Sequence, residues 1–376
     1  MKIQILYPVL LFVLIFISNP ACQKQDDLSQ MDIESEIIKE MQENNIPSVV
    51  ACIVKGDRII WEGIFGYANV EYQMPATRNT YYTLMSISKL VLSVSVMQLW
   101  ENGMIDLDAD INDYLSFDVR NPNYPDQKIT SHMLLTHTSG LAWPEDHEPI
   151  FDFHHFYTHE EPVLISEWLP DYILPGGEHY RNCVWKDYAP GEKQLYSNIA
   201  TSLLGLVVES ITGIDYRDYC DKQIFTPLEM DNTTFWLSEL NYDFIATPYT
   251  NSNKPMYYYS CRHYPAGFIS TNIEDFSHFM IAFLNKGVYK GKRILNEENI
   301  DKMLTVQNTG TGTSYLWGHS LGNRIGHKGG GTGFSTWAEW QLESNSGLFI
   351  FSNKVNDPVW PGGRIYELVR FKANDF

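Results

Sequence analysis

The chain has 376 residues, a length that predicts one large two-lobed domain or two domains. Apolar residues make up 44% of it, which is ample for a large core. The net charge of −19 argues against nucleic acid or an anionic lipid surface as the ligand.

Residues 1–22 have the pattern of an export signal. Lys2 precedes an apolar run at 5–17 that is too short for a comfortable membrane span. The segment ends in Ser-Asn-Pro-Ala-Cys22, which resembles a bacterial lipoprotein cleavage site with Cys22 as the lipidated residue. An ordinary signal peptide with an incidental cysteine is the alternative. We expect an exported protein, tethered through residues 23–31 to the periplasmic or surface side of a cell envelope membrane.

Both ends of the remaining chain predict strands and a flanking helix. Residues 32–45 form an amphipathic helix candidate, and two apolar runs at 48–54 and 59–64 surround a turn, as in a hairpin. Residues 315–352 alternate apolar and polar side chains between glycine turns, which predicts three or four antiparallel strands. A closing helix is expected at 365–371.

The middle of the chain predicts helices and one long loop. Residues 86–100 and 199–211 are strongly apolar, and 129–141 is a short helix with a glycine stop. Residues 142–190 show little periodicity, and a loop of that length is often a lid. A capping box at Thr271-Asn-Ile-Glu274 predicts the start of a further helix.

These elements predict an α+β fold in which the terminal strands join one antiparallel sheet. The sheet lobe comprises about 32–80 and 260–376, and an inserted, mainly helical lobe comprises about 81–259. We expect the functional site between the two lobes.

Several polar residues have a structural interpretation. The aspartates between Gly103 and Leu115 lack the glycine and closing glutamate of a calcium-binding loop, so we interpret them as caps and turns. His137 is expected to be a buried, hydrogen-bonded histidine. The four cysteines beyond residue 22 have no paired spacing, and we expect buried thiols at Cys52, Cys183, Cys220 and Cys261.

The apolar helix at 86–100 carries the main candidate site in its first turn. Ser86 and Lys89 are three residues apart, which places their side chains on one helix face. A serine hydroxyl becomes a good nucleophile when a neighbouring base takes its proton. Burial and the helix N-terminus both disfavour the ammonium form of lysine, so Lys89 could be that base. The alternative is a serine N-cap beside a lysine that reaches solvent.

Three motifs then stand in order: Ser86-Ile-Ser-Lys89, Tyr196-Ser-Asn198 and His327-Lys-Gly329. The order, the spacing and stretches such as 134–141 and 326–334 resemble the serine beta-lactamase and penicillin-binding protein superfamily, specifically its class C beta-lactamase-like branch. Tyr-x-Asn occurs three times in the chain, but only Tyr196 lies directly before an apolar helix. The resemblance covers about residues 33–355.

The resemblance implies a serine hydrolase that acts through an acyl-enzyme on an ester, amide or D-amino-acid peptide bond, with no metal or organic cofactor. It implies that Ser86 is the nucleophile, Lys89 its base and Tyr196 a second acid and base. Asn198 would orient the substrate and Lys89. His327, Gly329 and Gly330 would line the opposite wall, with the backbone amides of Ser86 and Gly330 as an oxyanion hole.

The third motif departs from the usual Lys-Thr-Gly, whose lysine helps to bind a substrate carboxylate. Only one of His327 and Lys328 can point into the site, because neighbouring strand residues face opposite ways. We favour His327. A histidine there weakens the case for efficient beta-lactam hydrolysis.

Three alternatives remain open. A metal site could form in the lid from Asp152, His154, His155, His159, Glu160 and Glu161. The chain could instead be a non-catalytic cell-wall peptide-binding protein. Third, an aromatic lid could exclude water and favour acyl transfer to an alcohol acceptor; its residues are Trp143, Phe151, Phe153, Phe156, Tyr157, Trp168 and Trp185.

Overall fold

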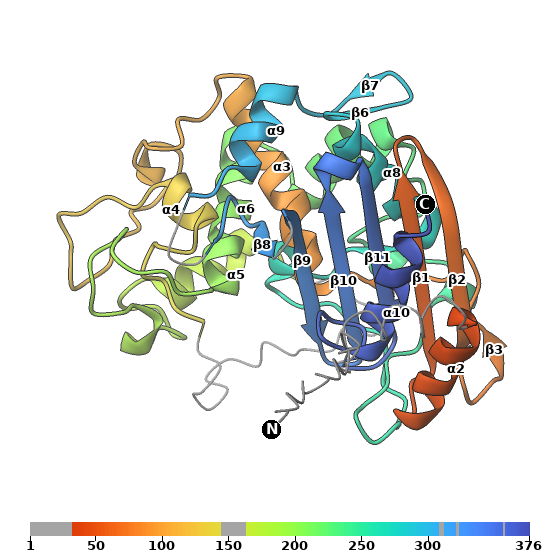
Figure 1. Cartoon of the computed structure of the whole chain (residues 1–376). Coiled ribbons are helices and arrows are strands. Elements are labelled where there is room, and N and C mark those ends of the chain that lie inside the picture. Colours follow the sequence, from red (N-terminus) through yellow and green to blue (C-terminus); the bar gives the residue numbers. More distant parts are fainter. Residues whose placement is uncertain (1–31, 144–162, 308–311, 321–322, 356–357) are drawn as a thin grey trace, which may run out of the picture.

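A seven-stranded antiparallel sheet lies at the centre of the computed structural model, which describes residues 32–143, 163–307, 312–320, 323–355 and 358–376. Its strand order is β3-β2-β1-β11-β10-β9-β8, so the first strand of the chain pairs directly with the last one. Figure 1 shows these two ends side by side in red and blue. The sheet strands are β1 (Ser48–Lys55), β2 (Arg58–Asn69), β3 (Met74–Pro75), β8 (Gly318–Ser320), β9 (Arg324–Gly331), β10 (Phe334–Gln341) and β11 (Ser346–Ser352).

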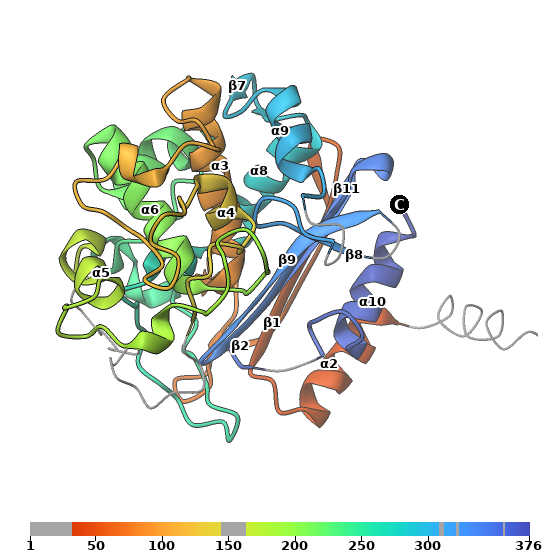
Figure 2. The ribbon, with the colours of Figure 1, turned by 90° about the vertical axis from the view of Figure 1, so that its left-hand side faces the viewer.

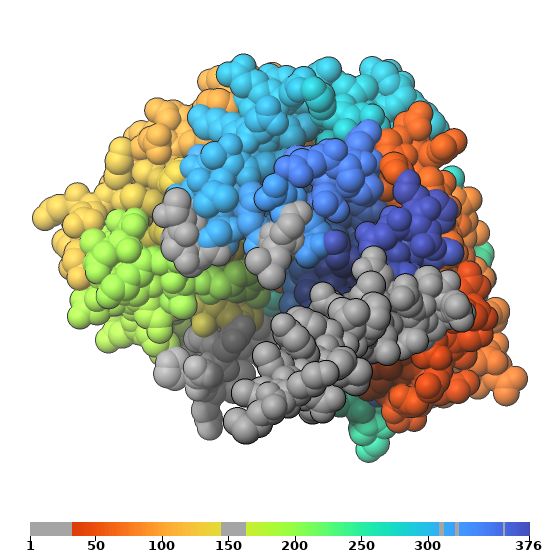
Figure 3. All heavy atoms as spheres, viewed as in Figure 1, coloured from red at the N-terminus to blue at the C-terminus, as the bar shows by residue number. Residues whose placement is uncertain are grey.

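The helices cover both faces of this sheet. Helices α2 and α10 lie on the outer face, and the others form the lobe on the inner face (Figure 2). In the space-filling view, the red N-terminal and blue C-terminal residues adjoin on one surface (Figure 3). The helices are α2 (Ile33–Glu43), α3 (Ser88–Glu101), α4 (Ser131–Leu135), α5 (Ile165–Ile173), α6 (Asn198–Thr212), α7 (Tyr216–Cys220), α8 (Ile273–Leu284), α9 (Glu297–Leu304) and α10 (Arg364–Ala373).

Strand β1 is central and buried on both faces. Val49 and Ile53 pack in the outer core with α2 and α10, while Val50 and Val54 pack in the inner core with the helical lobe. This period of two is what a strand imposes on its side chains. It explains why residues 49–54 are apolar without a break, since polar alternation would leave one face unpacked. The predicted α+β architecture, with one sheet from both chain ends, is therefore confirmed.

Helix α3 runs through the inner core. Every residue from Ser88 to Leu99 is buried, as its uncharged sequence predicts. The predicted start at residue 86 is one short turn too early, because Met85–Ile87 forms a separate 3₁₀ turn, η1. Ser86 thus lies in this turn and Lys89 in the first turn of α3.

Two further predictions about the middle of the chain need correction. Part of the expected lid is the amphipathic helix α5, and both Trp168 and Trp185 are 3% exposed within the inner core. The N-cap of α8 is Asn272 rather than Thr271, because the side chain of Asn272 accepts a hydrogen bond from the Asp275 amide and Thr271 is paired in the short strand β5 (Ser270–Thr271).

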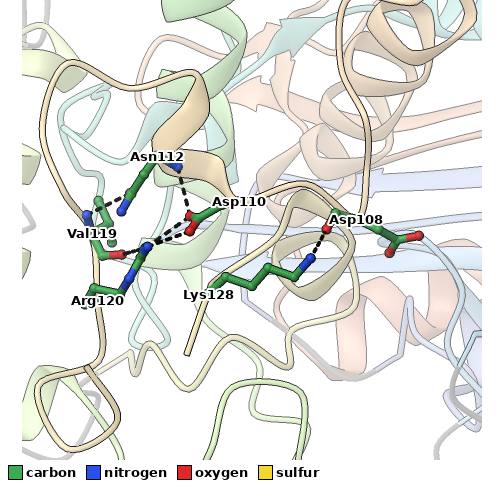
Figure 4. Close-up of polar contacts among 6 residues, drawn as sticks. All are labelled: Asp108, Asp110, Asn112, Val119, Arg120 and Lys128. Atoms are coloured by element: carbon green, nitrogen blue, oxygen red, sulfur yellow. Dashed lines mark hydrogen bonds and ion pairs between the residues drawn. The ribbon is translucent and has the colours of Figure 1, made fainter. Parts of the chain in front are cut away.

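Two of the aspartates that follow α3, Asp106 and Asp110, stabilise turns and a helical cap, as predicted; Figure 4 shows Asp110. Asp110 accepts a hydrogen bond from the backbone amide of Asn112 at 3.1 Å and pairs with the Arg120 guanidinium. Asp106 accepts from the backbone amide of Asp108 at 3.0 Å. Each of these carboxylates has a local partner, which accounts for their spacing without a cation.

Other expectations concern the thiols and the membrane. Cys52, Cys220 and Cys261 are buried, whereas Cys183 is half-buried. In the described ranges, no single helix is long and apolar enough to cross a bilayer; α6 and Tyr216–Leu228 meet that test only as a pair bent by 76°. The predicted export signal and Cys22 lie outside the described residues.

Candidate active site

A strained turn carries Ser86 at the base of a cleft between the two lobes. Met85, directly before it, has φ = 50°, a left-handed conformation that costs a non-glycine residue about 1 kcal/mol or more. Thr336 of β10 donates a hydrogen bond to the Leu84 carbonyl at 2.7 Å, which holds the turn against the sheet. The contact fixes Ser86 relative to the strands that form the opposite wall.

Lys89 is fully buried beside this serine. Its Nζ lies 3.0 Å from Ser86 Oγ and donates a hydrogen bond to the Ala266 carbonyl. Within the described part of the chain, no carboxylate pairs with it. Burial therefore lowers the pKa of Lys89 well below its ordinary range. A neutral amine has two N–H groups and one lone pair, so it can donate to the carbonyl and still accept the Ser86 proton.

Tyr196 makes the third contact at Ser86. It precedes α6, and its hydroxyl donates a hydrogen bond to Ser86 Oγ at 2.8 Å. Lys89 Nζ lies 5.0 Å from the centroid of the Tyr196 ring. One serine oxygen thus contacts both an amine and a phenol, as the motif spacing leads one to expect.

His137 holds Tyr196 in place, a role that the sequence did not reveal. Its Nδ1 accepts a hydrogen bond from the Ser197 amide at 3.3 Å, and its carbonyl accepts from the Leu195 amide at 2.8 Å. The His137 and Tyr196 ring centroids are 4.6 Å apart. Burial is the main reason that the pKa of His137 is lowered to about 3, so its ring is neutral and Nδ1 can accept. The sequence predicted only a buried, hydrogen-bonded histidine, because nothing local links it to Tyr196.

Asn198 is the first residue of α6. Its side-chain Oδ1 is buried without a hydrogen-bond partner among the described residues. No hydrogen bond joins Asn198 to Lys89 within those residues either. An unpaired buried acceptor is costly, so this oxygen is suited to a donor on a bound molecule.

Strand β9 forms the opposite wall and places His327 and Lys328 on different faces. His327 pairs with Ala338 of the inner core, and its ring centroid lies 6.5 Å from that of Tyr196. Lys328 pairs with Trp337, which packs on the outer core, and its Nζ lies 3.4 Å from the centroid of the Trp360 ring. The side chain that faces Tyr196 is therefore His327.

The glycines of β9 allow the strand to approach the nucleophile turn. A Cβ at Gly329 would lie 2.0 Å from Thr336 Oγ1 and 2.4 Å from the Leu84 carbonyl oxygen. Gly330 lines the same cleft as Ser86, Tyr196 and His327, with a cavity volume of about 840 Å³. The sequence predicted that these glycines leave space for a substrate. At Gly329, that space is instead occupied by Thr336 Oγ1 and the Leu84 carbonyl of the nucleophile turn.

The lid residues of the metal alternative lie outside the described residues. Where the structure describes the chain, no three His, Cys, Asp or Glu side chains gather as a metal site would require.

Comparison with known proteins identifies the family. The model of the family described as Beta-lactamase matches residues 33–368, so the chain belongs to the Beta-lactamase family. This confirms the predicted relationship to serine beta-lactamases and penicillin-binding proteins, a superfamily of serine hydrolases that act on small-molecule or peptide acyl substrates.

Individual relatives are distant. Protein flp of Staphylococcus aureus is 25% identical over 88% of this chain, which spans 64% of that relative's length. Penicillin-binding protein 4* of Bacillus subtilis is 24% identical over 81% of this chain and 67% of its own. A solved class C beta-lactamase mutant has a TM-score of 0.73 at 20% identity, covering 93% of this chain and 97% of its own. A D-alanine carboxypeptidase from Burkholderia cenocepacia has a TM-score of 0.71 at 18% identity, covering 94% and 99%.

The close approach at Gly329 gives a stability prediction. Gly329→Ala should lower the free energy of unfolding by about 1–3 kcal/mol, because the new methyl group displaces the hydrogen bond between Thr336 and Leu84. Gly318→Ala is the control, since a Cβ there would meet only the Gly326 carbonyl at 3.4 Å. Urea unfolding measures both, and equal stability of the two variants would contradict the packing described.

Proposed function

We propose that the protein is an exported serine hydrolase that forms an acyl-enzyme on Ser86. The observation that carries the proposal is the convergence of Lys89 Nζ and Tyr196 Oη on Ser86 Oγ, at 3.0 Å and 2.8 Å. A nucleophile within hydrogen-bond reach of two proton-transferring groups is the arrangement that covalent catalysis requires.

In this proposal Ser86 Oγ attacks the acyl carbonyl and its proton passes to the Lys89 amine. Tyr196 delivers a proton to the departing oxygen or nitrogen and becomes a phenolate. Water then attacks the acyl carbonyl and gives a proton to this phenolate, while Lys89 returns its proton to Ser86 Oγ as the acyl bond breaks. The backbone amides of Ser86 and Gly330 stabilise the oxyanion, a contribution of about 10²–10³ in rate for one donor. Asn198 Oδ1 accepts a hydrogen bond from the substrate.

The substrate class is an ester, amide or D-amino-acid peptide. Acyl transfer to an alcohol acceptor shares the same acyl-enzyme, but burial of Trp168 and Trp185 removes two aromatic residues from the proposed acceptor lid. A purely binding role does not explain why Lys89 Nζ and Tyr196 Oη both contact Ser86 Oγ. We therefore favour hydrolysis, and product analysis with and without added alcohols separates it from transfer.

Covalent labelling tests the nucleophile. A fluorophosphonate should add one adduct to the intact mass, located at Ser86, and Ser86→Ala should lose both the adduct and turnover. Ser35→Ala, at an exposed position of α2, is the control and should label as the parent protein does. Circular dichroism verifies that the Ser86→Ala fold is intact. Substantial hydrolysis by a folded Ser86→Ala variant would refute the assignment.

The lowered pKa of Lys89 gives a pH dependence. A base must be unprotonated, so the rate of Ser86 labelling should rise with pH through the pKa of Lys89 and level off well below about 10.4, the ordinary value for lysine. Lys89→Met removes the base, and the labelling rate should fall about 10²-fold or more at every pH. The control Lys39→Arg changes an exposed lysine of α2. A rise that begins only near pH 10, or unchanged labelling of Lys89→Met, would contradict this role.

Export and anchoring rest on residues 1–22. We propose a lipid on Cys22. The Cys22→Ser variant, expressed in bacteria that process lipoproteins, should therefore no longer be found in the membrane fraction. Mass spectrometry of the mature N-terminus should find a lipid on Cys22 of the parent protein. An unmodified cysteine, or an unchanged distribution of Cys22→Ser, would exclude the anchor.

A further inference from the structure

The wall of the cleft contains one hydrogen-bonding group whose proton is fixed by its partner. His327 Nδ1 lies 2.6 Å from the backbone carbonyl of Lys328. A carbonyl oxygen only accepts, so Nδ1 must carry the proton and donate it. In a neutral ring, Nε2 is then the nitrogen with the lone pair.

The surroundings keep this ring neutral. His327 is a half-buried residue of β9 that lines the cleft. The titratable groups described around it include Lys89, His137, Tyr196 and His319, with Lys328 next along its own strand. Burial is the main reason that the pKa of His327 is lowered to about 4. Nε2 has no hydrogen-bond partner among the residues that the structure describes.

Few ionisable side chains line the rest of the cleft, as far as the structure describes it. None of the described residues that line it is an aspartate or glutamate, although the chain has 46 acidic residues against 27 basic ones. Lys89 and His137 are held neutral by burial. Lys328 also lines the cleft, and its Nζ lies 3.4 Å from the centroid of the Trp360 ring, which is part of the same lining.

We propose that His327 is a specificity-determining acceptor, whose Nε2 binds an uncharged hydrogen-bond donor of the substrate, a hydroxyl or an amide N–H. A substrate carboxylate at this position would face the lone pair of His327 Nε2 and find no hydrogen-bond donor there. It would lose hydrogen bonds to water on binding without gaining one from the protein, which disfavours its binding. The inference rests on the proposed function and names its substrate class: acyl compounds with a neutral donor group where related enzymes take an anion.

The position of His327 indicates which part of the substrate is selected. Its ring lies beside that of Tyr196, which donates the leaving-group proton in the proposed mechanism. The donor that Nε2 accepts from therefore belongs to the leaving group, within a few bonds of the atom that departs. Aryl esters are suitable probes, because the leaving phenol can carry either group at one position.

The test compares kcat/KM for two esters of one acyl group, with 3-carbamoylphenol and 3-carboxyphenol as leaving groups, each corrected for its uncatalysed hydrolysis. The parent protein should prefer the carbamoyl ester about tenfold or more, the range for one hydrogen bond gained against one lost. His327→Lys replaces the acceptor by a cation and should reverse the preference, changing the ratio about 10²-fold. His327→Gln offers both a donor and an acceptor, so its ratio of kcat/KM values for the two esters should lie between those of the parent protein and His327→Lys.

Two further measurements keep the outcomes distinct. Lys328→Met should retain the parental ratio, and fluorophosphonate labelling of Ser86 should persist in every variant. A parental preference for the carboxylate ester overturns the inference, as does an unchanged ratio in labelled His327→Lys and His327→Gln. A preference that disappears in Lys328→Met also overturns it and assigns selectivity to the outer face. If Ser86 of the parent protein is not labelled at all, the proposed function fails and this inference fails with it.

Discussion

The site depends on one lysine amine that the core holds away from water. Lys89 has no exposed surface, and its polar contacts are the Ala266 carbonyl and Ser86 Oγ. An ammonium buried without a counter-ion is strongly disfavoured, so the amine takes its neutral form. The hydrogen bond from Lys89 to the Ala266 carbonyl uses one N–H group and orients the amine beside Ser86. The same desolvation that lowers the stability of the charged form produces the base that Ser86 needs.

The fold supplies this environment from distant parts of the chain. Helix α3 has no charged residue from Leu90 to Trp100, which allows it to run through the core. The Ala266 carbonyl belongs to a short helical turn far along the sequence, and the sheet that closes the cleft pairs β1 with β11. The hydrogen bond from Thr336 of β10 to the Leu84 carbonyl holds the nucleophile turn against the sheet, beside β9, which pairs with β10.

Local patterns made much of this predictable. The spacing of Ser86 and Lys89 in an apolar helix, the unbroken apolar run of β1 and the alternation of β8 to β11 each indicated their element. The support of Tyr196 by His137 was not predictable, because it joins residues distant in sequence through backbone groups. Likewise α5 was missed, since its helical periodicity is diluted within a long polar and aromatic stretch.

Lys89, His137 and His327 lie in or beside the cleft, and its described lining contains no aspartate or glutamate. Burial disfavours the charged form of each of these side chains, which suits the proposed recognition of the substrate through hydrogen bonds. This distinguishes the interior of the site from the acidic chain around it, which has a net charge of −19.

The central claim is that Lys89 is a neutral amine in the folded protein. Its most direct test is a pH titration of the lysine side-chain carbons by NMR, with ¹³C at Cε and with Lys89→Met to assign the signal. The account predicts one lysine with the chemical shift of a neutral amine at pH 7, a signal that is absent from the variant. If every lysine instead titrates as an ammonium with a pKa near about 10.4, the account is wrong.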